Sequence, residues 1–179
     1  MALLAAFPVH ADFVNFETPQ VHPIDLSPDG TKLAVCNTAD NRVEIFDVTS
    51  GAPVPTASIP AGLDPVTARF RSDTELWVVN QISDSVSVIN LTSQVVRATL
   101  QTRDEPADVV FAGVPLRAYV SCSAANVIQV FDPSNLAQAP TDVPIEADRP
   151  RALAVSRDGT KVYAAIFESG NGSTILGGG

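Results

Sequence analysis

The stretch HPIDLSPDGTKLAVCNTADNRVEIFD, residues 22–47, contains the clearest copy of a unit that recurs along this 179-residue chain. Each unit opens with a proline, and the four prolines lie 42, 41 and 44 residues apart: Pro23, Pro65, Pro106 and Pro150. A second set of positions agrees with this register, with steps of 43, 42 and 44 residues: Lys32, Glu75, Arg117 and Lys161. A fixed period of this length indicates a stack of supersecondary units, because one unit alone cannot bury its apolar face.

Each unit predicts four short strands. An apolar run follows the proline, and a tight turn follows the run, most clearly in Ser27-Pro28-Asp29-Gly30, where glycine supplies the positive φ that the turn needs. A second apolar run and a second reversal lead to a third strand with alternating apolar and polar residues, such as 43–45 and 86–88. A fourth strand, such as 56–59 or 97–101, leads to the next proline.

Four antiparallel strands in a repeat of this length predict an all-β fold, a β-propeller built from four-stranded blades. Neighbouring blades pack face to face, so the middle strands should be buried on both faces, as the apolar runs 76–79 and 162–166 suggest. A β-sandwich fits less well because it lacks strict repetition, and a parallel β-helix usually has a shorter period.

Several of these segments resemble the YVTN β-propeller repeat family. The resemblance rests on the strand Arg117-Ala-Tyr-Val-Ser, on the later strands Val86-Ser-Val-Ile-Asn and Ile128-Gln-Val-Phe-Asp, and on the turn Ser-Pro-Asp-Gly-Thr-Lys at residues 27–32. That family is similar in fold to the eight-bladed haem d1 domain of nitrite reductase and to the seven-bladed lactonase-type propellers. The resemblance implies the fold and not a function, because propellers carry many unrelated activities.

The number of blades has two readings. Four blades could close into a small ring, with residues 12–18 completing the last blade as its outer strand. Alternatively, residues 12–179 form an open arc of about four blades, with units starting near residues 23, 65, 106 and 150, from a larger propeller. The resemblance implies seven or eight blades, so we expect an open arc and a fragment of a longer chain.

The first eleven residues need a separate interpretation. Met1–Phe7 is a short apolar stretch, and Val9-His10-Ala11 places small residues at the two positions that signal peptidase reads. We therefore expect residues 1–11 to be a signal-peptide remnant and the protein to be periplasmic or extracellular. A disordered N-terminal tail is the alternative, since a basic n-region is missing.

Composition excludes some functions. The formal net charge is −9, from 20 acidic and 11 basic residues, and neither sign is clustered. Nucleic acid and anionic lipid both attract clustered lysine and arginine, so neither is an expected partner. No apolar run is long enough to span a membrane.

Few motifs point to chemistry. The chain has no Cys-x-x-Cys-His sequence for attached haem, no glycine-rich phosphate loop and no Gly-x-Ser-x-Gly sequence, so no cofactor is expected. Cys36 and Cys122 lie two units apart, too far for a disulfide, and we expect buried free thiols, with a metal site or redox pair as the alternative.

The residues before the four repeat prolines are the candidate site, with no catalytic residue assigned. They are His22, Asp64, Glu105 and Arg149. Because loops that lead into the innermost strands line one mouth of a propeller channel, these side chains could converge and bind a cation or a polar ligand. The alternative is that they are solvated turn residues, held extended by the proline that follows.

Three classes of function remain open. We expect a non-catalytic extracytoplasmic scaffold that binds a protein or small ligand at the channel mouth, without catalysis by this segment alone. The second reading is the N-terminal propeller of an oxidoreductase or electron-transfer protein whose cofactor motifs lie downstream. A lactonase-like hydrolase is third, because it needs convergent histidine, arginine and carboxylate groups on the channel face, and the sequence shows only His22.

Overall fold

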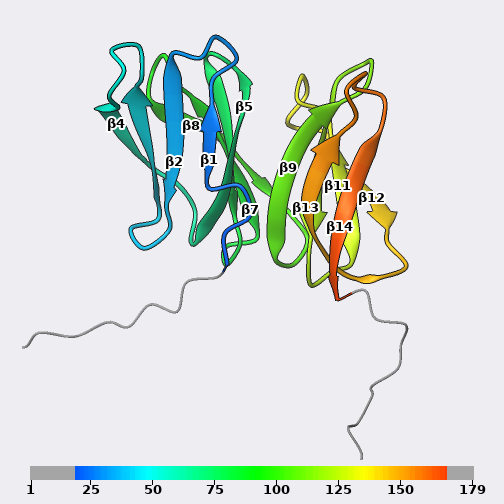
Figure 1. Ribbon diagram of the computed structural model, residues 1–179. Coiled ribbons are helices and arrows are strands. Elements are labelled where there is room, and N and C mark those ends of the chain that lie inside the picture. Colours follow the sequence, from blue (N-terminus) through cyan, green and yellow to red (C-terminus); the bar gives the residue numbers. More distant parts are fainter. Residues whose placement is uncertain (1–18, 169–179) are drawn as a thin grey trace, which may run out of the picture.

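The computed structural model describes residues 19–168, and this part of the chain is an all-β structure (Figure 1). Three antiparallel sheets have four strands each, and one sheet has two. The strands are β1 (Ile24–Leu26), β2 (Lys32–Asn37), β3 (Arg42–Asp47), β4 (Val54–Pro60), β5 (Pro65–Ser72), β6 (Glu75–Asn80), β7 (Ser85–Asn90), β8 (Val95–Gln101), β9 (Pro106–Ala112), β10 (Arg117–Cys122), β11 (Val127–Phe131), β12 (Thr141–Pro144), β13 (Asp148–Val155) and β14 (Val162–Glu168).

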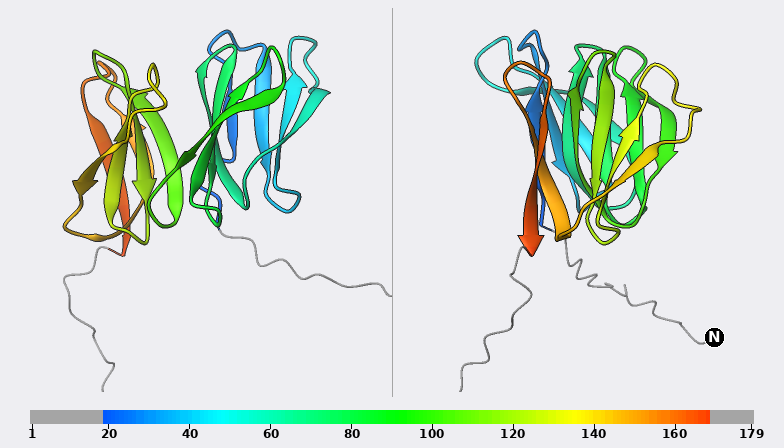
Figure 2. Two further views of the ribbon diagram at one scale, coloured as in Figure 1. Left: turned by 180° about the vertical axis from the view of Figure 1, so that it is seen from behind. Right: turned by 90° about the vertical axis from the view of Figure 1, so that its right-hand side faces the viewer.

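The four sheets are the blades that the repeat predicts. Blade 1 is β1–β4, blade 2 is β5–β8, blade 3 is β9–β12 and blade 4 is β13–β14, and the strands within each blade follow the chain order. The first strands of neighbouring blades contact one another: β1 with β5, β5 with β9, and β9 with β13. These four strands form the inner side of the stack, which we call the channel face, and Figure 2 shows the sheets standing side by side.

The turn after the first strand has the same hydrogen bonds in blades 1 and 4. In blade 1 the Asp29 carboxylate accepts bonds from the Ser27 hydroxyl at 2.6 Å and from the amide and hydroxyl of Thr31 at 3.0 and 2.8 Å. These bonds, led by that of Ser27, lower the pKa of Asp29 to about 2. Asp158 repeats the arrangement in blade 4, and its pKa is also about 2. Thus the SxDGTK sequence encodes this turn through its side chains.

The turn after the second strand links each blade to the next. Asn41, Asp84 and Asn126 all have a positive φ, and the side-chain oxygen of each accepts a hydrogen bond from a backbone amide at the start of the following blade. The backbone carbonyl of each also accepts a bond from the end of the fourth strand of its own blade. We call these three residues the connectors, because each fixes where the next blade begins.

The residues that bind the connectors have a left-handed backbone rather than the extended one that the sequence predicts. Asp64, Glu105 and Arg149 have φ angles of 60°, 52° and 60°, so the prediction that the following proline holds them extended is wrong for these three. Each donates its backbone amide to a connector side chain at 2.8 to 3.0 Å. That bond, made in all three blade junctions, offsets the unfavourable left-handed backbone.

Apolar clusters between the blades form the core. On β6, Leu76 and Val78 pack toward blade 1, whereas Trp77 and Val79 pack toward blade 3, and all four are fully buried. This alternation confirms that a middle strand is covered on both faces. A third cluster, around Val110 and Leu153, joins blades 3 and 4.

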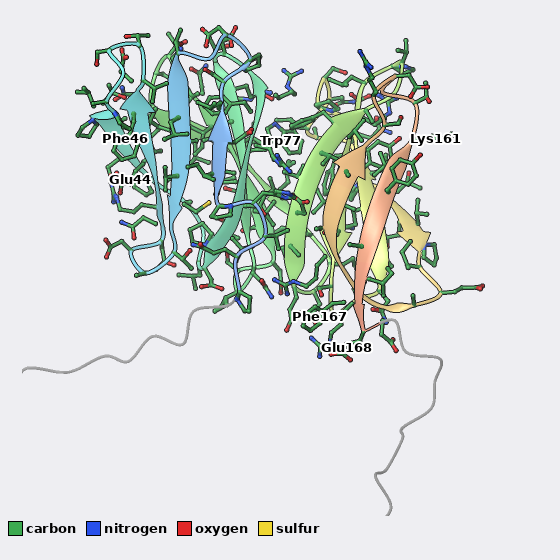
Figure 3. The ribbon with its side chains drawn as sticks, viewed as in Figure 1. Glu44, Phe46, Trp77, Lys161, Phe167 and Glu168 are labelled. Atoms are coloured by element: carbon green, nitrogen blue, oxygen red, sulfur yellow. The ribbon has the colours of Figure 1, made fainter. Side chains whose placement is uncertain are left out.

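One sheet face is exposed at each end of the stack. On blade 1 this face carries Ile24, Leu26, Leu33, Val35 and Phe46, whose counterparts in blade 2 are buried against blade 1: Ala68, Phe70, Leu76, Val78 and Ile89. On β14, Tyr163 and Phe167 are 57% and 71% exposed. The expectation that 162–166 is buried on both faces is therefore wrong, because no described sheet packs on this side. Figure 3 shows Phe46 and Phe167 at opposite ends.

Both cysteines are buried free thiols, as predicted. Burial raises the pKa of each thiol to about 12. Since the thiolate is the reactive form, we expect neither cysteine to be alkylated by iodoacetamide at pH 8 in the native protein, and both to be alkylated in urea. Mass spectrometry of the two samples checks this, and rapid labelling of the native protein would contradict it.

Two further predictions concern the ends of the chain and the membrane. The signal-peptide remnant at residues 1–11 and the outer strand at 12–18 lie outside the described residues. Between residues 19 and 168, no helix could cross a membrane.

Candidate functional site

The four side chains predicted at the channel mouth do not form one ring. Arg149 and Glu105 do meet, with Nη1 of the arginine 3.5 Å from Oε2 of the glutamate, and Arg149 also pairs with Glu168 at 3.1 Å. Asp64 is only 3% exposed, and no hydrogen bond joins its side chain to the other three among residues 19–168. His22 points elsewhere, so the structure joins two of the four.

His22 lies on the channel face, where it meets a residue from blade 3. Its Nδ1 is 2.9 Å from Oδ2 of Asp108, 86 positions along the chain. The backbone of His22 runs beside β5: its amide donates to the Thr67 hydroxyl at 3.1 Å, and its carbonyl accepts from the Ala68 amide at 3.0 Å. Blade 2 therefore holds the histidine that contacts blade 3.

Asp108 is a fully buried carboxylate with partners on several elements. Oδ1 accepts the backbone amide of Val109 at 2.8 Å, and Oδ2 accepts the amide of Leu153 on β13 at 2.7 Å as well as the His22 contact. Since two backbone amides donate to the carboxylate, the protonated Nδ1 tautomer of His22 is the one that fits it. In the neutral ring with its proton on Nδ1, Nε2 carries a lone pair that could accept a hydrogen bond or a proton from a ligand.

Asp25 is the counterpart of Asp108 in blade 1, two residues after the repeat proline. Its Oδ2 accepts the Phe70 amide on β5 at 2.8 Å, just as Asp108 accepts the Leu153 amide on β13. Both aspartates thus join the innermost strands of neighbouring blades. Blade 2 has Thr67 at this position, and its hydroxyl donates to the Ala107 carbonyl of blade 3 at 2.8 Å.

Arg69 lies between the two aspartates. Its Nη1 is 3.8 Å from Oδ1 of Asp25, and its Nε is 3.9 Å from Oδ1 of Asp108. These distances are too long for hydrogen bonds, and the buried Nε has no hydrogen-bond partner among the described residues. The two carboxylates therefore balance the positive charge of the guanidinium, but its terminal N–H groups could still donate hydrogen bonds to a ligand.

An open cavity of about 520 Å³ adjoins these groups. His22, Asp25, Arg69 and Arg71 line its polar part, and the rest of the wall is mostly apolar: Phe70, Val110, Phe111, Leu116, Leu153 and Val155. This volume lies within the range of small-molecule sites in proteins. We therefore take the cavity on the channel face as the candidate functional site. Residues 19–168 contain no group of three or more metal-ligating side chains of the His, Cys, Asp or Glu type.

Three of the four charged groups at this site were not predicted from the sequence. The lactonase-like function was the third expectation because the sequence shows only His22, whereas the structure brings Arg69, Asp25 and Asp108 to the same face. One signal was available for the aspartates, since Asp25 and Asp108 both follow a repeat proline by two residues. Arg69 has no comparable signal, because no other unit repeats it.

A protein-family model matches most of the chain. Residues 11–176 match the model of the family described as lactonase, 7-bladed β-propeller. The chain belongs to this lactonase family. Among the propeller classes that the sequence resembles, the seven-bladed lactonase type is matched, and residues 19–168 form three four-stranded blades and two strands of a fourth.

Relatives of the lactonase-family chain are longer than the chain itself. Antigen Lp49 of Leptospira interrogans serogroup Icterohaemorrhagiae serovar copenhageni (strain Fiocruz L1-130) is 29% identical over 150 residues, which cover 80% of this chain and 32% of the antigen. Hydrazine synthase of Kuenenia stuttgartiensis superposes with a TM-score of 0.78 at 24% identity, covering 92% of this chain and 47% of that one. A candidate 6-phosphogluconolactonase from Bacteroides uniformis ATCC 8492 gives 0.67 at 21% identity, covering 80% and 49%. The chain therefore spans about a third to a half of these proteins, and the two structures show the shared fold.

Proposed function

We propose that the channel face binds a lactone or related ester and promotes its hydrolysis. The observation that carries this proposal is the pairing of His22 with buried Asp108 beside Arg69, at the edge of an open cavity. Membership in the lactonase family supports the same reaction class. The scaffold function expected from the sequence places ligand binding at the channel mouth, without a chemical step, and of its four candidate residues only His22 also lines this cavity.

The roles of the three side chains follow from their contacts. The His22 Nε2 takes a proton from water as the water oxygen attacks the carbonyl carbon of the lactone. The Arg69 guanidinium stabilises the negative charge that develops on the carbonyl oxygen. The carbonyl carbon then releases the ring oxygen, which takes the proton from the imidazolium, and the product is a hydroxy acid. Asp108 orients the ring and stabilises the imidazolium through Nδ1.

Replacing His22 with glutamine tests the proposal. Hydrolysis of a panel of five- and six-membered lactones by the purified chain is followed by proton release in weak buffer. We expect His22→Gln to slow hydrolysis about 100-fold or more, since a general base contributes about 10² to 10⁴ in rate. The matched control is Glu146→Gln on the exposed surface, which should hydrolyse the same lactones at the wild-type rate.

Two results would contradict hydrolysis: no turnover of any lactone by the wild type, or equal rates for wild type and His22→Gln. Binding without turnover, lost in His22→Gln, would support the non-catalytic scaffold instead.

A periplasmic or extracellular location remains part of the proposal and is tested by fractionating cells that express the full gene.

A further inference from the structure

The charged and the apolar residues of the candidate cavity come from different blades. Blades 1 and 2 supply His22, Asp25, Arg69 and Arg71, whereas the apolar side chains, except Phe70, come from β9, β13 and the turn before β10 in blades 3 and 4. Leu116 in that turn is 41% exposed, although it lines the cavity. A ligand that filled this space would contact charged groups from blades 1 and 2 and mostly apolar side chains from blades 3 and 4.

The two arginines in the wall are not equivalent. Arg71 is already paired, since its guanidinium contacts both carboxylate oxygens of Glu75. Arg69 makes only the two long contacts with Asp25 and Asp108, and its buried Nε lacks a hydrogen bond within the described part of the chain. The buried Nε is not accessible to a ligand, but the terminal nitrogens of Arg69 make no hydrogen bond within residues 19–168, so an oxygen atom of a ligand could accept a hydrogen bond from them.

We infer that this site takes an amphiphilic lactone, with its carbonyl oxygen at Arg69 and an aliphatic chain along Phe111, Leu116 and Val155. The inference rests on the proposed function and adds the substrate class. A polyhydroxylated sugar lactone would leave its hydroxyl groups facing that apolar wall without partners, which disfavours it. The acid formed on ring opening has the same two parts, so a carboxylate with an alkyl chain should also bind.

Binding along a homologous series tests the chain-length requirement. γ-Butyrolactone, γ-octanolactone and γ-dodecanolactone are titrated against the purified chain by isothermal calorimetry and saturation-transfer NMR, with octanoate as the product-like probe. We expect affinity to rise by up to about fourfold for each methylene that the cavity buries. Arg69→Gln should weaken octanoate binding about tenfold or more, because a charged hydrogen bond is lost.

A pair of variants in one turn distinguishes binding in the cavity from nonspecific hydrophobic binding to the protein surface. Leu116→Ser should weaken γ-dodecanolactone binding several-fold and leave γ-butyrolactone unchanged. Val114→Ser is the matched control, since Val114 is fully exposed in the same turn but does not line the cavity. Equal losses in both variants would overturn the inference.

The outcomes distinguish the substrate class from the reaction. Affinity that does not change with chain length, with or without turnover, overturns the amphiphilic class. Affinity that rises with chain length in a protein without turnover supports the class and contradicts hydrolysis. Turnover that is fastest for γ-dodecanolactone supports both.

Discussion

Replacing Trp77 with alanine is expected to lower the free energy of unfolding by about 4 kcal/mol. The indole is fully buried between blades 2 and 3 and packs edge-on against Phe111, with ring centroids 5.4 Å apart at 88°. Its Nε1 donates to Oε1 of Glu75 at 2.8 Å. The alanine variant would have a cavity in the core and one hydrogen bond fewer at a buried carboxylate.

The buried carboxylate of Glu75 is the reason that the indole N–H of Trp77 contributes to stability. Burial raises the pKa of its carboxyl, but hydrogen bonds from Arg71 and Trp77 and the charges of Arg71 and Arg97 outweigh burial, so the pKa is lowered. The control is Trp77→Phe, which keeps an aromatic ring against Phe111 and loses the N–H. It should retain more than half of the stability that alanine loses.

Urea unfolding followed by circular dichroism measures both variants. Fluorescence is unsuitable because Trp77 is the only tryptophan in the chain. A loss below about 1 kcal/mol for Trp77→Ala would contradict the packing described between blades 2 and 3.

Replacing Asp108 with asparagine is expected to lower the free energy of unfolding by about 3 kcal/mol. Its two oxygens accept the amides of Val109 and Leu153 and the Nδ1 of His22. An asparagine has only one acceptor oxygen, so its NH₂ group must face at least one donor. The charge that balances Arg69 is lost as well.

The same variant should also remove the proposed activity, because His22 loses the group that orients it. Asp104→Asn is the matched control, since Asp104 is exposed in the loop that leads into β9. Its stability should stay within about 0.5 kcal/mol of the wild type. A normal unfolding midpoint for Asp108→Asn would show that the aspartate does not join β9 to β13 as described.

The fold was predictable because the signals that specify it lie within one unit. Gly30 and Asp29 define the first turn, and the apolar run at 76–79 defines a buried strand, so comparison of the units revealed both. The exposed side of β14 was not predictable from its apolar residues, because burial there depends on a neighbouring sheet rather than on the strand itself.

The site was less predictable because its groups come from different blades. His22 was identified from its place before Pro23, but its partner Asp108 is two blades away, and alignment of the units does not show contacts between them. The φ angle of Asp64 was also missed, since the Asn41 side chain that stabilises it lies 23 residues earlier.

The connectors have a consequence for how the protein tolerates length changes. Asn41, Asp84 and Asn126 each bind the first residues of the following blade, at separations of 23, 21 and 23 residues. Inserted residues in the turn between the first and second strands would enlarge one rim of the molecule and leave these bonds in place. A residue inserted directly after Asp64, Glu105 or Arg149 would instead shift an entire blade out of step with its neighbour. Natural variation in loop length should therefore be concentrated in the turns on the rim opposite the connectors.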